Sequence, residues 1–135
     1  MTTQMRLPDP KQAKEYFENK LSFTCGPAEL KEMMDEKENV TIIDVRDEGS
    51  YAEGHVPGAI NLPKEKWATF EGLQKEGLNV VYCYNIVCHL AATAATTFAG
   101  AGYPVKEMEG GFSFWKEFDY EVETGSRPKF EKMSA

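Results

Sequence analysis

The sequence predicts an α/β domain built on a largely parallel sheet. Two apolar runs, Val40 to Val45 (VTIIDV) and Asn79 to Tyr82 (NVVY), are typical of strands that are buried on both faces. Segments with helical periodicity precede and follow these runs, and strands that alternate with helices favour parallel pairing. The length of 135 residues, with 41% hydrophobic and 27% charged residues, fits one domain with its own hydrophobic core.

The N-terminal part predicts a helix from Asp9 to Leu21. Asp9 followed by Pro10 is typical of a helix start, and the apolar residues of the segment fall on one face. These apolar residues are Ala13, Tyr16, Phe17 and Leu21. We expect this face to pack against the domain, and docking of a partner or of a second copy is the alternative.

A short strand and a second helix are predicted next. Leu21 to Thr24 has the composition of a short strand, and Gly26 with Pro27 begins a helix that continues to about Lys37. Cys25 lies between these two elements, and we expect it to have no chemical role.

Charged residues lie at the end of the strand predicted at Val40 to Val45. Ligand chemistry in parallel sheets gathers at the carboxyl ends of the strands, so we expect Asp44 and Arg46 to lie near the same edge as Cys83. A structural salt bridge between the two is preferred over direct catalysis.

The segment Tyr51 to Pro63 is rich in glycine and proline. It predicts a turn around His55 and then a short strand at Ala59 to Asn61. A general base is one interpretation of His55, and a hydrogen-bonded turn residue is the preferred one.

The stretch from Asn79 to Gly102 predicts a strand, a loop that opens with Cys83, and a helix that begins near His89. The first N–H groups of a helix have no partner within it and carry the positive end of its dipole. A cysteine at that point has a lowered pKa and acts as a nucleophile, so we expect Cys83 to be partly or largely thiolate at neutral pH. The alternative is a buried cysteine that acts as a small hydrophobic residue.

The composition argues against several classes of function. A net charge of −7 disfavours nucleic acid or an anionic membrane as the main partner. Two histidines make a His/Cys zinc site improbable, and three cysteines form no paired pattern, which suits a reducing compartment. No apolar run reaches the length of a membrane span and the N-terminus lacks the apolar centre of a signal peptide, so we expect a cytoplasmic protein.

Three segments together resemble the rhodanese-like (sulfurtransferase) domain family. They are IIDVRDEGSYAEGHVPGAINLP at Ile42 to Pro63, VVYCYNIVCHLAATAATTFAGAGYPV at Val80 to Val105, and EGGFSFW at Glu109 to Trp115. Their order and spacing are those of the family. The resemblance implies a rhodanese-like domain over residues 22–118. The helix predicted before it is then an N-terminal extension over residues 1–21, and the charged composition of residues 119–135 predicts a loosely ordered C-terminal tail.

The resemblance implies a five-stranded, mainly parallel sheet flanked by helices on both faces. It also implies sulfur transfer in which Cys83 takes a sulfane sulfur, becomes a persulfide and passes the sulfur to a nucleophilic acceptor, without a metal or an organic cofactor. The active-site loop then continues through Tyr84, Asn85, Ile86 and Val87. Other positions are assigned to the scaffold: Asp44, Arg46 and His55 near the site, and Gly110, Gly111 and Trp115 as the C-terminal turn of the family.

The loop departs from the pattern of thiosulfate-using members, which is Cys-x-x-Gly-x-Arg followed by Ser or Thr. Ile86 replaces the glycine, Cys88 the arginine and His89 the hydroxyl residue, and no Lys or Arg lies between Cys83 and Val105. Loss of one charge-assisted pair costs about 1.5–3 kcal/mol, or about one to two decades in affinity. We therefore expect weak binding of thiosulfate and a small-molecule or protein persulfide as the donor. Phosphatase activity is disfavoured for the same reason.

Cys88 and His89 are candidate assisting residues. Cys88 either attacks an oxidised or persulfidated Cys83 to form a disulfide, or it fills the place of the arginine and points away. His89 either donates a proton or charge at the site, or it is a locally hydrogen-bonded residue at the helix start.

The first functional interpretation is a sulfurtransferase or persulfide carrier that uses Cys83 and passes sulfur to a thiol or other nucleophile. The alternatives are a dithiol redox protein that cycles a Cys83–Cys88 disulfide, and a noncatalytic rhodanese-like binding module. The sequence leaves the donor, the acceptor, the pathway and the oligomeric state open.

Overall fold

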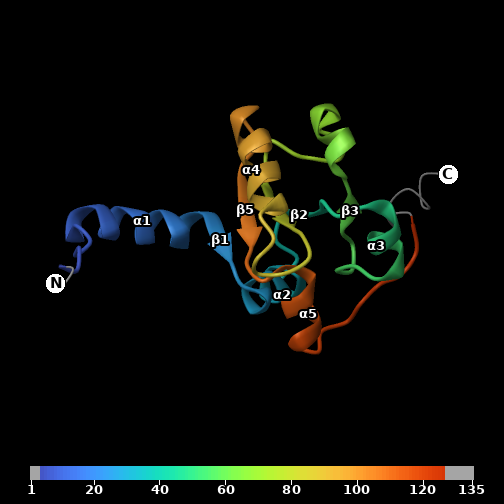
Figure 1. Cartoon of the computed structure of the whole chain (residues 1–135). Helices are drawn as coiled ribbons and strands as arrows, with labels where there is room; N and C mark the ends of the chain where they lie inside the picture. The colour runs from blue at the N-terminus through green and yellow to red at the C-terminus, as the bar shows by residue number, and fades with distance from the viewer. Residues whose placement is uncertain (1–3, 127–135) are drawn as a thin grey trace.

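The computed structural model describes residues 4–126. A five-stranded sheet has the order β1-β5-β4-β2-β3, and every neighbouring pair is parallel (Figure 1). The strands are β1 (Thr24–Cys25), β2 (Val40–Asp44), β3 (Ile60–Asn61), β4 (Leu78–Tyr82) and β5 (Val105–Met108). The helices are α1 (Pro10–Phe23), α2 (Pro27–Asp35), α3 (Glu48–Glu53), the 3₁₀ helix η1 (Lys64–Thr69), α4 (Leu90–Gly100) and α5 (Gly111–Glu117). The predicted α/β class and parallel sheet are confirmed.

The central strands are buried on both faces because their side chains alternate between two cores. Ile42 pairs with Val80, and both face the core that also holds residues of α2, α3 and α5. Ile43 pairs with Val81, and both face the core formed with α4 and η1. Cys83 continues this second face, so the chain delivers it to the N-terminal end of α4. Helices therefore cover both faces of the sheet, as predicted.

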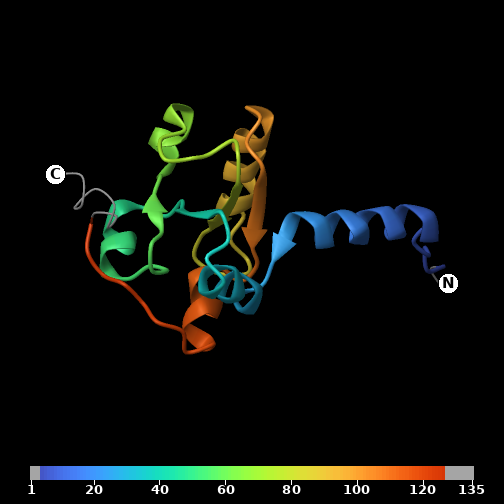
Figure 2. The same ribbon diagram turned by 180° about the vertical axis from the view of Figure 1, so that it is seen from behind.

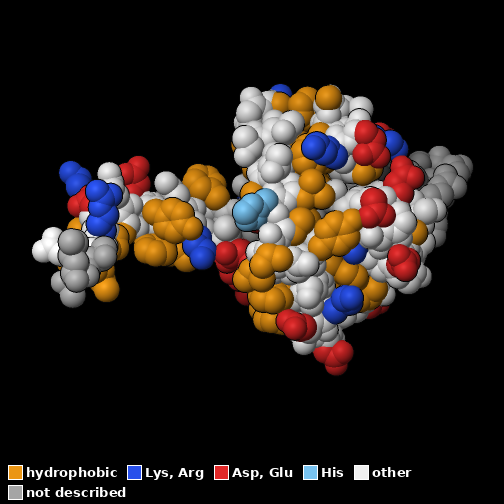
Figure 3. All heavy atoms as spheres, in the orientation of Figure 1, with side chains coloured by type: hydrophobic (Ala, Val, Ile, Leu, Met, Phe, Trp, Pro, Cys, Tyr) orange, Lys and Arg blue, Asp and Glu red, His pale blue; other side chains and the backbone are white. Residues whose placement is uncertain are grey.

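Helix α1 projects from the domain as an arm (Figures 1 and 2). Asp9 caps it by accepting a hydrogen bond from the N–H of Gln12 at 3.2 Å, and none of its residues is buried. Hydrophobic side chains lie exposed along it, including Tyr16 at 60% and Leu21 at 78% (Figure 3). The prediction that this face packs against the domain was wrong. The short strand begins only at Thr24, because the helix continues through the residues predicted to form it.

The C-terminal segment is more ordered than predicted up to residue 126. It leaves α5 and returns along α3 (Figure 2), where the main chains of His55 and Glu123 exchange two hydrogen bonds of 2.9 Å. The N–H of Gly125 donates to the carbonyl of Ala52 at 2.9 Å. The rest of the predicted loose tail, residues 127–135, lies outside the described residues. Among the helices of residues 4–126, none has the length and apolarity needed to cross a membrane.

Candidate active site

The candidate site is the loop that joins β4 to α4 at the carboxyl edge of the sheet. Cys83 directly follows β4, and the loop ends at His89, the residue before α4. Asn85 folds the loop, since its side chain accepts from the N–H of Val87 at 3.1 Å and its carbonyl accepts from the N–H of Cys88 at 3.2 Å. No loop residue has a positive φ, so Ile86 is accommodated without the glycine of the family pattern.

Backbone N–H groups at the N-terminus of α5 donate hydrogen bonds to the main chain of the loop. The N–H of Phe112 donates to the carbonyl of Cys83 at 2.9 Å, and the N–H of Ser113 donates to that of Tyr84 at 3.0 Å. Gly111 has a φ of +60°, and a Cβ there would lie 2.6 Å from the Cys83 carbonyl oxygen. The two adjacent glycines predicted as a turn therefore allow α5 to approach the cysteine main chain. This is the scaffold role expected of Gly110 and Gly111, and Trp115 is fully buried behind them.

Cys83 is buried, with 2% of its surface exposed, and several groups of the loop and of α4 form hydrogen bonds with its thiol. The backbone N–H groups of Tyr84 and Ala91 point to its sulfur, and its thiol interacts with the Cys88 side chain. The Cys83 thiol also donates to the Cys88 carbonyl, with 3.6 Å between sulfur and oxygen. Burial first, and then the hydrogen bond with Cys88, raise the pKa of Cys83 to about 11. The expectation of a partly or largely deprotonated Cys83 was wrong for the reduced protein, because the backbone donors do not outweigh these two effects.

Cys88 is the more acidic thiol of the pair. Its side chain is turned toward Cys83 rather than away, and it is half-buried. Partial burial alone would raise the pKa of Cys88, but hydrogen bonds from Cys83 and from the N–H groups of Leu90 and Tyr84 lower it. The first negative charge of the pair therefore resides on Cys88, and the single hydrogen of the Cys83 thiol then bonds the Cys88 sulfur in place of the Cys88 carbonyl.

Asp44 and Arg46 form the predicted salt bridge beside the loop. Their side chains are almost fully buried, and Nη2 of Arg46 lies 2.7 Å from Oδ2 of Asp44. Tyr82 donates to the same carboxylate oxygen at 2.7 Å, and Arg46 also donates to the carbonyl of Gly54 at 2.6 Å. The guanidinium lies 5.7 Å from the centre of the Tyr84 ring. The arginine is thus fixed as scaffold beside the loop, with Nε engaged by Asp44 and Nη2 engaged by Asp44 and Gly54.

The outer face of the loop is apolar. Ile86 and Val87 are 62% and 78% exposed, and Tyr84 is tied to the neighbouring loop by donating its hydroxyl to Asp47. That hydrogen bond is the main cause that lowers the pKa of Asp47 to about 2. The predicted loop residues therefore form the rim of the site, with Asn85 folding the turn.

A cavity of about 150 Å³ opens beside Cys88. Its lining includes His89 and two half-buried carboxylates of β5 and the following turn, Glu107 and Glu109. Burial and the charge of Glu109 raise the pKa of Glu107, while the charge of His89 lowers it. Sequence reasoning missed both carboxylates. Their position just before Gly110 could have indicated them. Glu107 lies in β5 and pairs with Val81, two residues before Cys83, near the carboxyl edge of the sheet.

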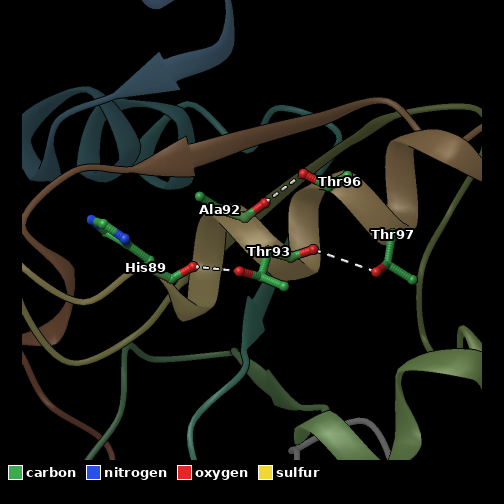
Figure 4. A pocket seen from close by; sticks show the side chains of 5 residues that line it. All are labelled: His89, Ala92, Thr93, Thr96 and Thr97. Atoms are coloured by element: carbon green, nitrogen blue, oxygen red, sulfur yellow. Dashed lines mark hydrogen bonds between the residues drawn. The ribbon is translucent and has the colours of Figure 1, made fainter.

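His89 is the N-cap residue that directly precedes α4. Its carbonyl accepts from the Thr93 hydroxyl at 2.9 Å, and its ring extends away from the row of threonines on the exposed helix face (Figure 4). Thr96 and Thr97 donate to the carbonyls four residues before them in the same manner. Because His89 also lines the cavity beside Cys88, its imidazole is next to the site without contacting Cys83 through any hydrogen bond described.

His55 is a buried turn residue, as preferred. Its Nδ1–H donates to the carbonyl of Tyr51 at 2.7 Å, and its Nε2 lies 3.2 Å from a carboxylate oxygen of Glu123. The ring stacks on that of Tyr51, with 3.7 Å between centroids. Both nitrogens are thus used to hold the C-terminal segment against α3. Within residues 4–126, no cluster of three or more His, Cys, Asp or Glu side chains is arranged to hold a metal ion.

The fold is thus a parallel α/β domain that presents a cysteine loop at the carboxyl edge of its central strand β4. The chain belongs to the rhodanese-like domain family, whose model matches residues 26–118. The resemblance in the sequence is thereby confirmed.

Named relatives include the thiosulfate sulfurtransferase GlpE of Shewanella oneidensis, which is 37% identical over 86 residues, or 62% of this chain and 83% of GlpE. The HTH-type transcriptional regulator Rv0324 of Mycobacterium tuberculosis is 34% identical over 88 residues, but the matched part spans only 39% of that protein. The similarity to Rv0324 is therefore confined to part of the regulator.

Solved structures share the fold. The BH2092 protein of Bacillus halodurans superposes with a TM-score of 0.78 at 34% identity, covering 88% of this chain and 89% of that one. A rhodanese-like domain protein of Staphylococcus aureus gives a TM-score of 0.68 at 25% identity, covering 77% and 99% of the two chains.

Proposed function

We propose that this protein is a sulfurtransferase that carries sulfane sulfur as a persulfide on Cys83. The observation that supports this most strongly is the convergence of the Tyr84 and Ala91 N–H groups on the Cys83 sulfur. These donors are fixed before the reaction and stabilise the Cys83 thiolate that attacks the sulfur donor.

The nucleophile is activated by transfer of its proton to Cys88. As Cys83 attacks the outer sulfur of a donor persulfide, R–S–SH, its proton passes to the hydrogen-bonded Cys88 sulfur. The S–S bond of the donor breaks, a new bond joins the outer sulfur to Cys83, and R–SH leaves. The pair thus forms the attacking thiolate of Cys83 although the resting thiol has a raised pKa. Cys88 assists this step without being essential to it, because in its absence the side chain that raises the pKa of Cys83 is gone and the proton leaves to water.

A persulfide fits the surroundings of the loop better than thiosulfate does. The guanidinium of Arg46 is engaged by Asp44 and Gly54, while Glu107 and Glu109 place negative charge beside the loop. A dianion gains no charge-assisted pair there, whereas a small persulfide or a protein persulfide needs none. The relatives named thiosulfate sulfurtransferases support the reaction class, and the donor is where this chain is expected to differ.

Turnover with cyanide as acceptor tests the proposal, with thiocyanate as the measured product and the uncatalysed rate subtracted. We expect kcat/KM with cysteine persulfide to exceed that with thiosulfate by about tenfold or more, given the missing charge-assisted pair. Cys83→Ser should abolish both activities, and Cys25→Ala, a matched change at a buried cysteine away from the loop, should retain them. Equal turnover by Cys83→Ser would refute the proposal.

A further inference from the structure

Cys83 and Cys88 form a hydrogen-bonded dithiol in one short loop. The Cys83 thiol interacts with the Cys88 side chain, and its sulfur lies 3.6 Å from the Cys88 carbonyl oxygen. The N–H of Tyr84 is directed to both sulfurs. This orientation argues against the alternative in which Cys88 fills the place of the arginine and points away from Cys83.

We infer that Cys88 is a resolving thiol, which attacks the Cys83 sulfur of the persulfide and releases hydrogen sulfide. This inference rests on the proposed function, because it needs a persulfide on Cys83. The bond between Cys83 and the sulfane sulfur breaks, and a Cys83–Cys88 disulfide forms. The step balances as Cys83–S–SH plus Cys88–SH giving Cys83–S–S–Cys88 plus H₂S, so the two cysteines are oxidised and the sulfane sulfur is reduced.

The surroundings of Cys88 suit an attacking thiol. The N–H groups of Leu90 and Tyr84 point to its sulfur and stabilise its thiolate, which is the reactive form. The protein therefore holds a ready nucleophile next to the proposed persulfide. Intramolecular placement of this kind gives an effective concentration well above that of a free thiol.

The cavity beside Cys88 gives the disulfide a route back to the dithiol. Cys88 lines this cavity of about 150 Å³, whereas Cys83 is buried beneath the loop. An external thiol attacks the Cys88 sulfur, Cys83 leaves and takes a proton, and a second thiol releases the first as its own disulfide. Together these steps turn a persulfide carrier into a persulfide reductase whose reductant is a thiol.

A single-turnover experiment tests the inference. Reduced wild-type protein, Cys88→Ser, Cys88→Ala and Cys25→Ala are each mixed with substoichiometric cysteine persulfide in the absence of other thiols. Intact mass and sulfide released are then measured over time, and circular dichroism checks that each variant is folded.

We expect wild type and Cys25→Ala to lose about 2 Da and to release one sulfide for each persulfide consumed. Both Cys88 variants should keep a gain of about 32 Da on Cys83 and release less than about one-tenth as much sulfide in the same time. Equal sulfide release with and without Cys88 would overturn the resolving role while the carrier function stood. Sulfide release by Cys83→Ser, run alongside these proteins, that equals the wild-type release would instead overturn the proposed function, and the resolving role with it.

Discussion

Gly111 lies against the main chain of Cys83, and this contact leaves no room for a side chain. Its φ is +60°, and a Cβ would stand 2.6 Å from the Cys83 carbonyl oxygen and 2.9 Å from the Asn85 nitrogen. Both atoms belong to the backbone, so relief requires the loop to move. The position of the reactive loop therefore depends on a residue that lies more than twenty positions later in the chain.

Gly111→Ala is expected to lower the free energy of unfolding by about 1–3 kcal/mol and to slow sulfur uptake by Cys83, because the new methyl group displaces the loop. Urea unfolding and persulfide formation measure the two effects. Gly100→Ala is the matched control, since a Cβ at Gly100 meets no atom within 4 Å. An unaltered uptake rate in Gly111→Ala would show that the loop does not need this support.

The two thiols of the loop are expected to titrate in a defined order. Because the pKa of Cys88 is lowered and that of Cys83 is raised to about 11, iodoacetamide should label Cys88 first in the reduced protein at neutral pH. In Cys88→Ser the neighbouring sulfur that raises the pKa of Cys83 is absent, so the alkylation profile of Cys83 should shift to lower pH. Peptide mass spectrometry across a pH series follows each site. Labelling of Cys83 before Cys88, or a shift to higher pH in the variant, would contradict this order.

The acidic cavity beside Cys88 predicts selectivity for the charge of the external thiol. Glu107 and Glu109 repel an anionic thiol and attract a cationic one, while Lys20, 3.6 Å from Glu109, offsets part of its charge. Partly buried charges at this range change rates by about three- to tenfold. Cysteamine should therefore reduce the Cys83–Cys88 disulfide, the step in which the external thiol enters this cavity, faster than 2-mercaptoethanesulfonate, after correction for thiol pKa. Glu107→Gln with Glu109→Gln should remove most of the difference. Lys14→Met, the control, changes a charge on the distant α1 arm and should leave the rate difference between the two thiols unchanged.

The buried pair of Asp44 and Arg46 is expected to act on stability rather than on chemistry. Arg46→Met leaves an uncompensated buried carboxylate and should lower the free energy of unfolding by about 3–5 kcal/mol. Lys14→Met breaks the exposed pair of Lys14 and Glu18 and should change the free energy of unfolding by less than about 0.5 kcal/mol. Urea unfolding compares the variants. A folded Arg46→Met protein that takes up no sulfur would point instead to a direct catalytic part for the guanidinium.

The sequence predicted the elements that local patterns define. The runs at Val40 to Val45 and Asn79 to Tyr82 are strands in the sheet centre because continuous apolar residues report burial on both faces. The position of Cys83 between a strand and a helix, and the turn at Gly110 and Gly111, followed from the same local signals and from the family resemblance.

Features that depend on contacts distant in the chain were missed. The apolar face of α1 signalled a helix, but periodicity does not say which surface covers that face, and within residues 4–126 it is exposed. The tail returns to α3 through main-chain hydrogen bonds between His55 and Glu123, which no side-chain pattern encodes. The pKa of Cys83 was mispredicted because a helix start is visible in sequence, whereas burial and the inward turn of Cys88 are not.

The central claim is that Cys83 accepts sulfane sulfur, and peptide-level mass spectrometry of the Cys25→Ala, Cys88→Ser double variant tests it most directly. With Cys83 as the one remaining thiol, treatment with cysteine persulfide should add about 32 Da to the peptide that contains Cys83, and cyanide should remove it with formation of thiocyanate. A folded double variant whose Cys83 gains no sulfur, or holds sulfur that cyanide does not remove, would contradict the claim.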